Sequence, residues 1–138
     1  MKPERQIINK INWNEQFKIR LASAEESMDK HDLIKLLVVR KLIRKNKNQK
    51  FWIRIYTEFH LENSHIIPDI YFENIRTKEI ICYEIQKDLF KDYIKRREEE
   101  YQNVEIYPFQ NLDLIIIPIK KSPDNLSELN KWLDQFII

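Results

Sequence analysis

Two acidic residues, Asp69 and Glu84, are placed so that two neighbouring strands could bring their carboxylates together. Asp69 follows Pro68 within an apolar run over residues 66–72, and Glu84 lies within a second apolar run over residues 78–87. Two runs of strand length that flank a polar turn predict an antiparallel hairpin. Carboxylates that meet at one end of a sheet form a hard, oxygen-rich site suited to Mg²⁺ or Mn²⁺.

Side chains of the second strand alternate between the two faces of the predicted sheet. Glu84 and Gln86 therefore project from one face, whereas Ile85 and Lys87 project from the other. An acid and an amide on one face, close to the acid of the partner strand, indicate a polar site at one end of an otherwise apolar sheet.

The segment Pro68-Asp69, followed after a gap by Glu84-Ile85-Gln86-Lys87, resembles the motif of the PD-(D/E)xK nuclease superfamily. The motif of that superfamily is Pro-Asp, then an acid, any residue and a lysine. In this chain the lysine position holds Gln86, and Lys87 comes one residue later. The Glu-Ile-Gln form is similar to nuclease domains of the competence-protein and resolvase type.

The resemblance implies a divalent-metal-dependent nuclease that hydrolyses phosphodiester bonds in DNA. Asp69 and Glu84, with the main-chain carbonyl of Ile85, would hold Mg²⁺ or Mn²⁺, which lowers the pKa of a bound water. Gln86 would orient that water but cannot supply charge, so a cation such as Lys91 on the next helix would have to compensate. Lys87 would reach the site only if the strand were bulged.

Glu26 is a further candidate, because a glutamate on the first core helix joins the metal site in many members of the superfamily. Ser23 followed by Glu26 is also a capping-box pattern, so the alternative interpretation of Glu26 is capping of a helix over residues 23–45. Arg97, on the packing stripe of a later helix, either reaches the site or pairs with an acid such as Glu100.

No acid occurs between Asp32 and Glu58, whereas eight cations do: Lys35, Arg40, Lys41, Arg44, Lys45, Lys47, Lys50 and Arg54. Such a cluster is typical of a surface that binds a phosphate backbone. The alternative is a solvated helix end whose cations favour the C-terminal dipole. We expect contacts with DNA from Arg40, Arg44, Lys45, Lys47 and Lys50, and from Lys91 and Lys95 on the helix after the hairpin.

The other elements complete an α/β fold. The sequence predicts a short strand within 17–21, a strand over 50–62, a helix over 88–103, a strand over 112–119 that is buried on both faces, and a last helix from 122 to 138. The order of elements over about residues 23–119 matches the restriction-endonuclease-like α-β-β-β-α-β core of the superfamily. That core has a mixed central sheet flanked by helices, and here it would carry an N-terminal arm and an extra C-terminal helix.

Composition limits the remaining classes. A chain of 138 residues predicts a single domain over residues 1–138, and the absence of glycine excludes the Gly-rich loops that bind nucleotide cofactors. The lone Cys82 cannot form an internal disulfide and is expected to be buried. No apolar run approaches the roughly 18 to 20 residues that span a bilayer, so we expect a cytoplasmic protein without membrane contact. A homodimer is compatible with the sequence.

Two other functions fit parts of the chain. A catalytically inactive nucleic-acid-binding protein would keep the nuclease fold and the basic stretch, and the glutamine in the lysine position favours it. Intact Asp69 and Glu84 argue against it, because unpaired acids that face phosphate are costly without a cation. A purely structural or protein-interaction domain explains the apolar packing but leaves the basic stretch unused.

Overall fold

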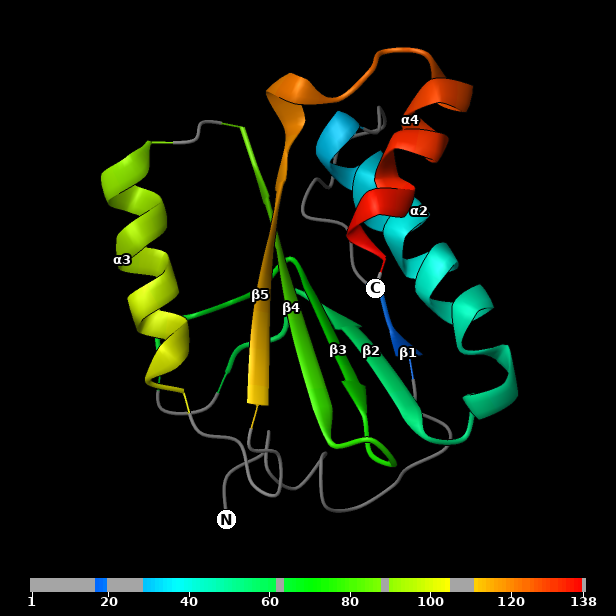
Figure 1. Ribbon diagram of the computed structural model, residues 1–138, viewed down its shortest axis with the longest axis vertical. Helices are drawn as coiled ribbons and strands as arrows, with labels where there is room; N and C mark the ends of the chain where they lie inside the picture. The colour runs from blue at the N-terminus through cyan, green and yellow to red at the C-terminus, as the bar shows by residue number, and fades with distance from the viewer. Residues whose placement is uncertain (1–16, 20–28, 62–63, 88–89, 105–110, 138) are drawn as a thin grey trace.

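The computed structural model describes residues 17–19, 29–61, 64–87, 90–104 and 111–137, and these form one mixed sheet with helices on both faces (Figure 1). The strands are β1 (Phe17–Lys18), β2 (Ile53–Thr57), β3 (Ile70–Asn74), β4 (Glu79–Gln86) and β5 (Asn111–Pro118). The α-helices are α2 (Lys30–Lys45), α3 (Lys91–Gln102) and α4 (Leu126–Trp132). Short 3₁₀ turns cover Lys47–Gln49, Ile119–Lys121 and Leu133–Phe136.

The five strands lie in the order β1-β2-β3-β4-β5. β2, β3 and β4 form an antiparallel meander, whereas β1 pairs with β2 and β5 pairs with β4 in parallel. The parallel β4–β5 pair needs a crossover, which α3 provides. The predicted α/β class, the hairpin and the order of elements from α2 to α4 are therefore confirmed. Within the described ranges, no helix is both long and apolar enough to cross a membrane.

Each face of the sheet has its own apolar core. Ile34, Val38 and Leu42 of α2 pack with Leu129 and Leu133 of the C-terminal segment on one face. Tyr101 of α3 packs on the other face, together with the free and buried Cys82. Because β4 is covered on both faces, its polar side chains are buried wherever they do not lie at a strand end.

The strand predicted over residues 50–62 is shorter than expected and ends at Thr57. Glu58 has a φ of 52°, a left-handed conformation that breaks the strand alternation. A strand that continued to residue 62, as predicted, would place Phe59 and Leu61 on the same face as Ile55. Phe59 and Leu61 instead pack with the α3-side core, opposite to the face of Ile55.

Two helices, α2 and α3, begin later in the chain than predicted. α2 begins at Lys30 and not at Ser23, because the side chain of Asp29 caps it by accepting a hydrogen bond from the backbone N–H of Asp32. The Ser23–Glu26 pattern lies outside the described residues. α3 begins at Lys91, after Phe90, and not at residue 88 as predicted.

Candidate active site

Asp69 lies directly before β3, where it contacts both β4 and α2. Its Oδ2 accepts a hydrogen bond of 2.7 Å from the backbone N–H of Ile85. Its Oδ1 lies 3.1 Å from Nε2 of His31, in the first turn of α2. The hydrogen bond to Ile85 fixes the Asp69 carboxylate beside the strand position that follows Glu84.

Glu84 lies near the end of β4, and its side chain is only 3% exposed. Its Oε1 accepts a hydrogen bond of 2.6 Å from Nε of Arg97 on α3. Nη1 of Arg97 also donates to Oε2 of Glu100 at 2.9 Å. The two alternatives that the sequence left open for Arg97 are both realised, since it pairs with Glu100 and also reaches the predicted site.

The two acids interact electrostatically. Burial raises the pKa of Glu84 above its ordinary value, Arg97 opposes this shift, and the negative charge of Asp69 adds to it. The hydrogen bond with Asp69 raises the pKa of His31, although the partial burial of the ring opposes the rise. Asp69 and Glu84 are thus close enough for each carboxylate to respond to a positive charge placed between them.

Tyr101 of α3 lies beside Arg97, on the face of the sheet that α3 covers. Cζ of Arg97 lies 5.8 Å from the centroid of the Tyr101 ring. The Tyr101 hydroxyl is buried close to Glu84, and its interaction with that carboxylate opposes the burial-driven rise of the Glu84 pKa. Within the described residues it makes no hydrogen bond of ordinary length and angle, so the contact with Glu84 is a loose one.

The other residues predicted for the site lie at the end of β4, just after it, or outside the described residues. Gln86, the last residue of β4, is partly exposed, and Lys87 is exposed just after the strand. Cys82 belongs to the α3-side core and Ile85 to the other core, so the predicted alternation of β4 holds through Glu84. Whether the carbonyl of Ile85 binds a metal stays a prediction, and Glu26 lies outside the described residues.

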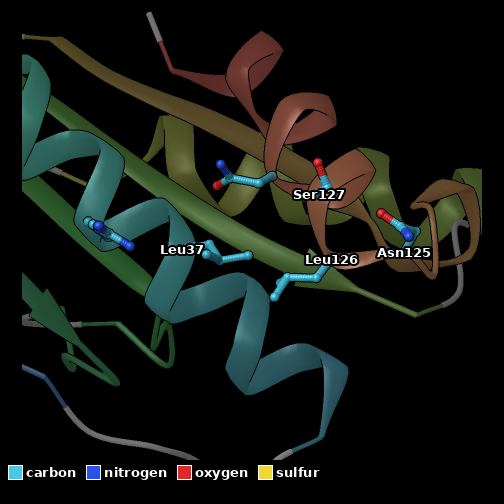
Figure 2. Close-up of a pocket in the computed structure, with 6 residues that line it drawn as sticks. Leu37, Asn125, Leu126 and Ser127 are labelled. Carbon is cyan, nitrogen blue, oxygen red and sulfur yellow. The ribbon is translucent and has the colours of Figure 1, made fainter.

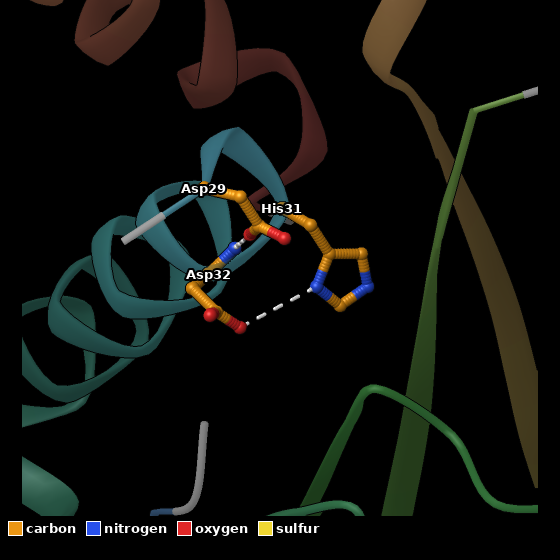
Figure 3. Close-up of side chains that lie close together, drawn as sticks. All are labelled: Asp29, His31 and Asp32. Atoms are coloured by element: carbon orange, nitrogen blue, oxygen red, sulfur yellow. Dashed lines mark hydrogen bonds and ion pairs between the residues drawn. The ribbon is translucent and has the colours of Figure 1, made fainter. Parts of the chain in front are cut away.

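His31 is the residue that sequence analysis missed. Figure 3 shows its ring projecting from the first turn of α2 toward the strands. Its Nδ1 lies 3.7 Å from Oδ1 of Asp32, and ligand atoms of Asp29, His31 and Asp32 all lie within 4.8 Å of one another. Asp29 caps α2, and Asp32 is buried 4.0 Å from Lys35. These roles account for both acids, so we assign no metal to this group.

Three of the eight cations of the basic stretch form ion pairs with acids of the protein itself. Lys35 is fully buried and donates to Oε1 of Glu58 at 2.6 Å. Arg54 is buried and pairs with Glu73 on the neighbouring strand at 3.0 Å. The third, Lys41, pairs with Asp134 near the C-terminal end of the chain. The interpretation of all eight as one solvated or phosphate-binding surface is therefore wrong for the buried Lys35 and Arg54, whereas Lys41 is partly exposed beside the exposed Asp134.

The five cations proposed to contact DNA from this stretch are all exposed, namely Arg40, Arg44, Lys45, Lys47 and Lys50. Lys91 and Lys95 are also exposed, but they lie on α3 and hence on the other face of the sheet. A groove of about 430 Å³ lies between α2 and the start of α4 (Figure 2). It is lined by Leu37, Arg40, Asn125, Leu126, Ser127 and Asn130. None of the acids of the candidate site lines this groove.

The candidate active site therefore consists of Asp69 and Glu84, with Gln86, Arg97 and His31 around them. Sequence analysis found the first three from strand spacing, and it left the role of Arg97 open. His31 carried no sequence signal beyond its place near the start of a helix. Comparison of the chain with protein-family models, curated proteins and solved structures gave no match.

Proposed function

We propose that this chain is a divalent-metal-dependent nuclease of the PD-(D/E)xK type, which hydrolyses phosphodiester bonds in DNA. The observation that carries the proposal is the hydrogen bond from the Ile85 N–H to Asp69, which fixes the Asp69 carboxylate beside the strand position that follows Glu84, where its charge acts on Glu84. The sheet order and the helix on each face support the restriction-endonuclease-like core that the motif implies.

The donor set fits a hard cation. A carboxylate offers about four lone-pair positions. Among the described residues, Asp69 contacts His31 and the backbone N–H of Ile85. Glu84 contacts Arg97 and lies beside the Tyr101 hydroxyl, so both carboxylates retain positions for Mg²⁺ or Mn²⁺. Such a cation supplies Lewis-acid polarisation and a bound water of lowered pKa. The buried Tyr101 hydroxyl adds a donor on the same side of the sheet.

The protein's own side chains have separate roles in this proposal. Asp69 and Glu84 hold the cation, and Gln86 orients the attacking water by hydrogen bonding. Arg97 supplies the positive charge that the amide of Gln86 lacks, because its guanidinium already lies against Glu84. Preorganised positive charge of this kind stabilises the charge that grows on the phosphoryl oxygens.

A nucleic-acid-binding protein without catalysis is the second candidate, and one observation favours it. Arg97 already pairs with Glu84, and Asp69 accepts from the Ile85 N–H beside His31. The acids therefore do not need a metal ion to avoid the cost of unpaired buried charge. The presence of Asp69 and Glu84 is therefore compatible with both a nuclease and a binding protein without catalysis.

The deciding experiment is a calorimetric titration with Mn²⁺, together with cleavage of linear, branched and single-stranded DNA in Mg²⁺. We expect Asp69→Asn and Glu84→Gln each to abolish Mn²⁺ binding and to lower cleavage by about 100-fold or more. Glu79→Gln, an exposed acid on the same strand, is the matched control and should change neither. Unchanged Mn²⁺ binding in both site variants would eliminate the metal site, and binding of DNA without cleavage would establish the second candidate.

A further inference from the structure

A cluster of exposed cations, here called the basic corner, forms where α2 ends and β2 begins. It consists of Arg44, Lys45, Lys47, Lys50, Arg76 and Lys78, all exposed. Two hydrogen bonds join the β3–β4 turn to the segment before β2. Nδ2 of Asn74 donates to Oε1 of Gln49 at 3.0 Å, and the N–H of Ile75 donates to the carbonyl of Trp52 at 2.8 Å. The fold thus adds two cations of the turn to four that the sequence already groups.

Two aromatic side chains lie within the basic corner. Phe51 is 61% exposed and Trp52 is 42% exposed. Nζ of Lys50 lies 5.3 Å from the centroid of the Phe51 ring. Glu79 is the exposed acid next to this surface, and its carboxylate accepts from the Thr77 hydroxyl. Within the ranges that the structure describes, this sets one acid against six cations, so the corner is positively charged.

We propose that the basic corner binds single-stranded nucleic acid, with its cations on the phosphates and the rings of Phe51 and Trp52 stacked on unpaired bases. Surfaces of this kind combine a positively charged track with exposed aromatic rings. A duplex offers its phosphates to the same cations, but its bases are already stacked on one another, so the rings would gain little from it. Charge complementarity explains the cations, and base stacking explains the exposure of the rings.

The basic corner and the candidate active site lie at opposite ends of the same strands. Asp69 precedes β3 and Ile75 follows it, so the two ends are separated by about 20 Å at roughly 3.3 Å per residue. The inference rests on nucleic acid being the substrate of the proposed function, and it adds that the substrate carries unpaired bases. Binding at the corner can nevertheless be measured without cleavage, because no residue of the corner belongs to the acid site.

The test measures fluorescence anisotropy of short labelled oligonucleotides in EDTA, which prevents metal-dependent cleavage. Oligothymidylate, oligouridylate and a DNA duplex of equal length are compared on the full chain. We expect the wild type to prefer the single strands, and Phe51→Leu and Trp52→Leu each to weaken single-strand binding by about tenfold while duplex binding changes little. Trp52→Phe keeps a ring and should retain most of the affinity. Phe90→Leu, an exposed ring outside the corner, is the matched control.

Each outcome decides the inference. Equal affinity for duplex and single strands in the wild type would overturn it, as would a Phe51→Leu/Trp52→Leu variant that binds oligothymidylate as well as the Phe90→Leu control. A preference for oligouridylate or for oligothymidylate would assign RNA or DNA as the ligand. Asp69→Asn should bind all oligonucleotides like the wild type, so a failure of cleavage in that variant remains distinct from a failure of the basic corner.

Discussion

Arg97 occupies the position from which a cation can act on Glu84. Its guanidinium bridges Glu84 on the sheet and Glu100 on its own helix. In the PD-(D/E)xK motif a lysine two residues after the acid supplies the charge, whereas this chain has Gln86 there. The arginine is therefore the nearest replacement that the described structure offers, and it also competes with a metal for the same carboxylate.

Replacing Arg97 by glutamine should separate these two effects. We expect Arg97→Gln to lower metal-dependent cleavage by about 10- to 100-fold, because the guanidinium charge is lost. Its affinity for Mn²⁺, measured by calorimetry, should be unchanged or higher, because the competitor for Glu84 is gone. Arg97→Lys should retain more cleavage than Arg97→Gln. Arg96→Gln, which removes an exposed cation next to Arg97 on α3, is the control. An equal loss of activity in that variant would show that the total positive charge of α3, and not the contact of Arg97 with Glu84, supports cleavage.

Gln86 and Lys87 test which side chain takes the lysine position. We expect Gln86→Ala to lower cleavage by about 10- to 100-fold, which corresponds to losing about 1.4 to 2.8 kcal/mol of positioning of the attacking water. Gln86→Lys should keep or raise the rate, and Lys87→Ala should change it little, because Lys87 is exposed beyond the strand. Loss of cleavage in Lys87→Ala but not in Gln86→Ala, measured by single-turnover kinetics, would mean that Lys87, and not Gln86, takes the role of the lysine in the motif that the chain resembles.

At the scale of elements, this chain makes its turns without glycine. Lys78, in the β3–β4 turn, has a φ of 60°, a region that costs an ordinary residue about 1 kcal/mol or more. The side chain of Asn74 stabilises the turn by accepting hydrogen bonds from the backbone N–H groups of Arg76 and Thr77. The β3–β4 hairpin therefore keeps a strained residue that the asparagine supports.

Glycine at position 78 should relieve this strain. We expect Lys78→Gly to raise the free energy of unfolding by about 0.5 to 1 kcal/mol, since the gain in the folded turn exceeds the added entropy of the unfolded chain. Urea denaturation measures the change. Arg76→Gly is the matched control, because its φ is not positive and glycine there should lower stability. A stabilising effect of both variants would contradict the backbone explanation.

The Arg54–Glu73 pair joins β2 to β3 inside the protein. Burial raises the pKa of Glu73 to about 7, although Arg54 opposes the shift. Because this folded pKa exceeds the ordinary value of 4.5, the folded state binds more protons than the unfolded state between these values. The contribution of Glu73 to stability therefore falls as pH rises through this window.

Removing Arg54 should enlarge this pH dependence. We expect Arg54→Met to lower the free energy of unfolding by about 3 kcal/mol at alkaline pH, where Glu73 would be a buried charge without its partner. The loss should be clearly smaller near pH 5, because Glu73 can then be protonated. Urea denaturation at the two pH values measures the difference, and the exposed Arg76→Met is the control. An equal loss at both pH values would show that Arg54 acts through packing alone.

At the scale of the whole molecule, the length of the strands separates the acids from the cations of the basic corner. Asp69 and Glu84 lie at one end of the hairpin, and the basic corner lies at the other end. Lys91 and Lys95 lie across the sheet on α3. A nucleic acid that contacts both the basic corner and the acids must extend over at least the length of β3, about 20 Å at roughly 3.3 Å per residue.

The salt dependence of binding measures which cations take part. Replacing Arg44, Lys45 and Lys47 together by alanine should flatten the slope of log K against log salt by about 0.9 per lost contact on duplex DNA and about 0.7 on single strands. Lys91→Ala/Lys95→Ala should add its own, independent decrease if α3 also contacts the strand. Lys131→Ala, an exposed cation of α4, is the control and should leave the slope unchanged. An unchanged slope in the triple variant would remove this surface from the interface.

The sequence by itself determined the α/β class, the hairpin and the faces of β4, because alternation in an extended strand follows from local geometry. It also predicted that Asp69 and Glu84 lie at neighbouring strand positions, which the structure confirms, while their role as metal ligands stays a prediction. It misplaced the ends of several elements. The start of α2 is set by the side-chain cap of Asp29, and the end of β2 is followed by Glu58 in a left-handed conformation. Both depend on a single side chain or dihedral angle, which a hydrophobic pattern does not reveal.

Only the tertiary structure decided which charges are available to a ligand. A run of cations in the sequence does not show that Lys35 and Arg54 are buried in ion pairs, because their partners Glu58 and Glu73 come from other elements. The same holds for Arg97, whose contact with Glu84 joins α3 to β4. Ion pairs between elements depend on how the elements pack, so local sequence pattern determines which residues are charged, and packing determines which of them face solvent.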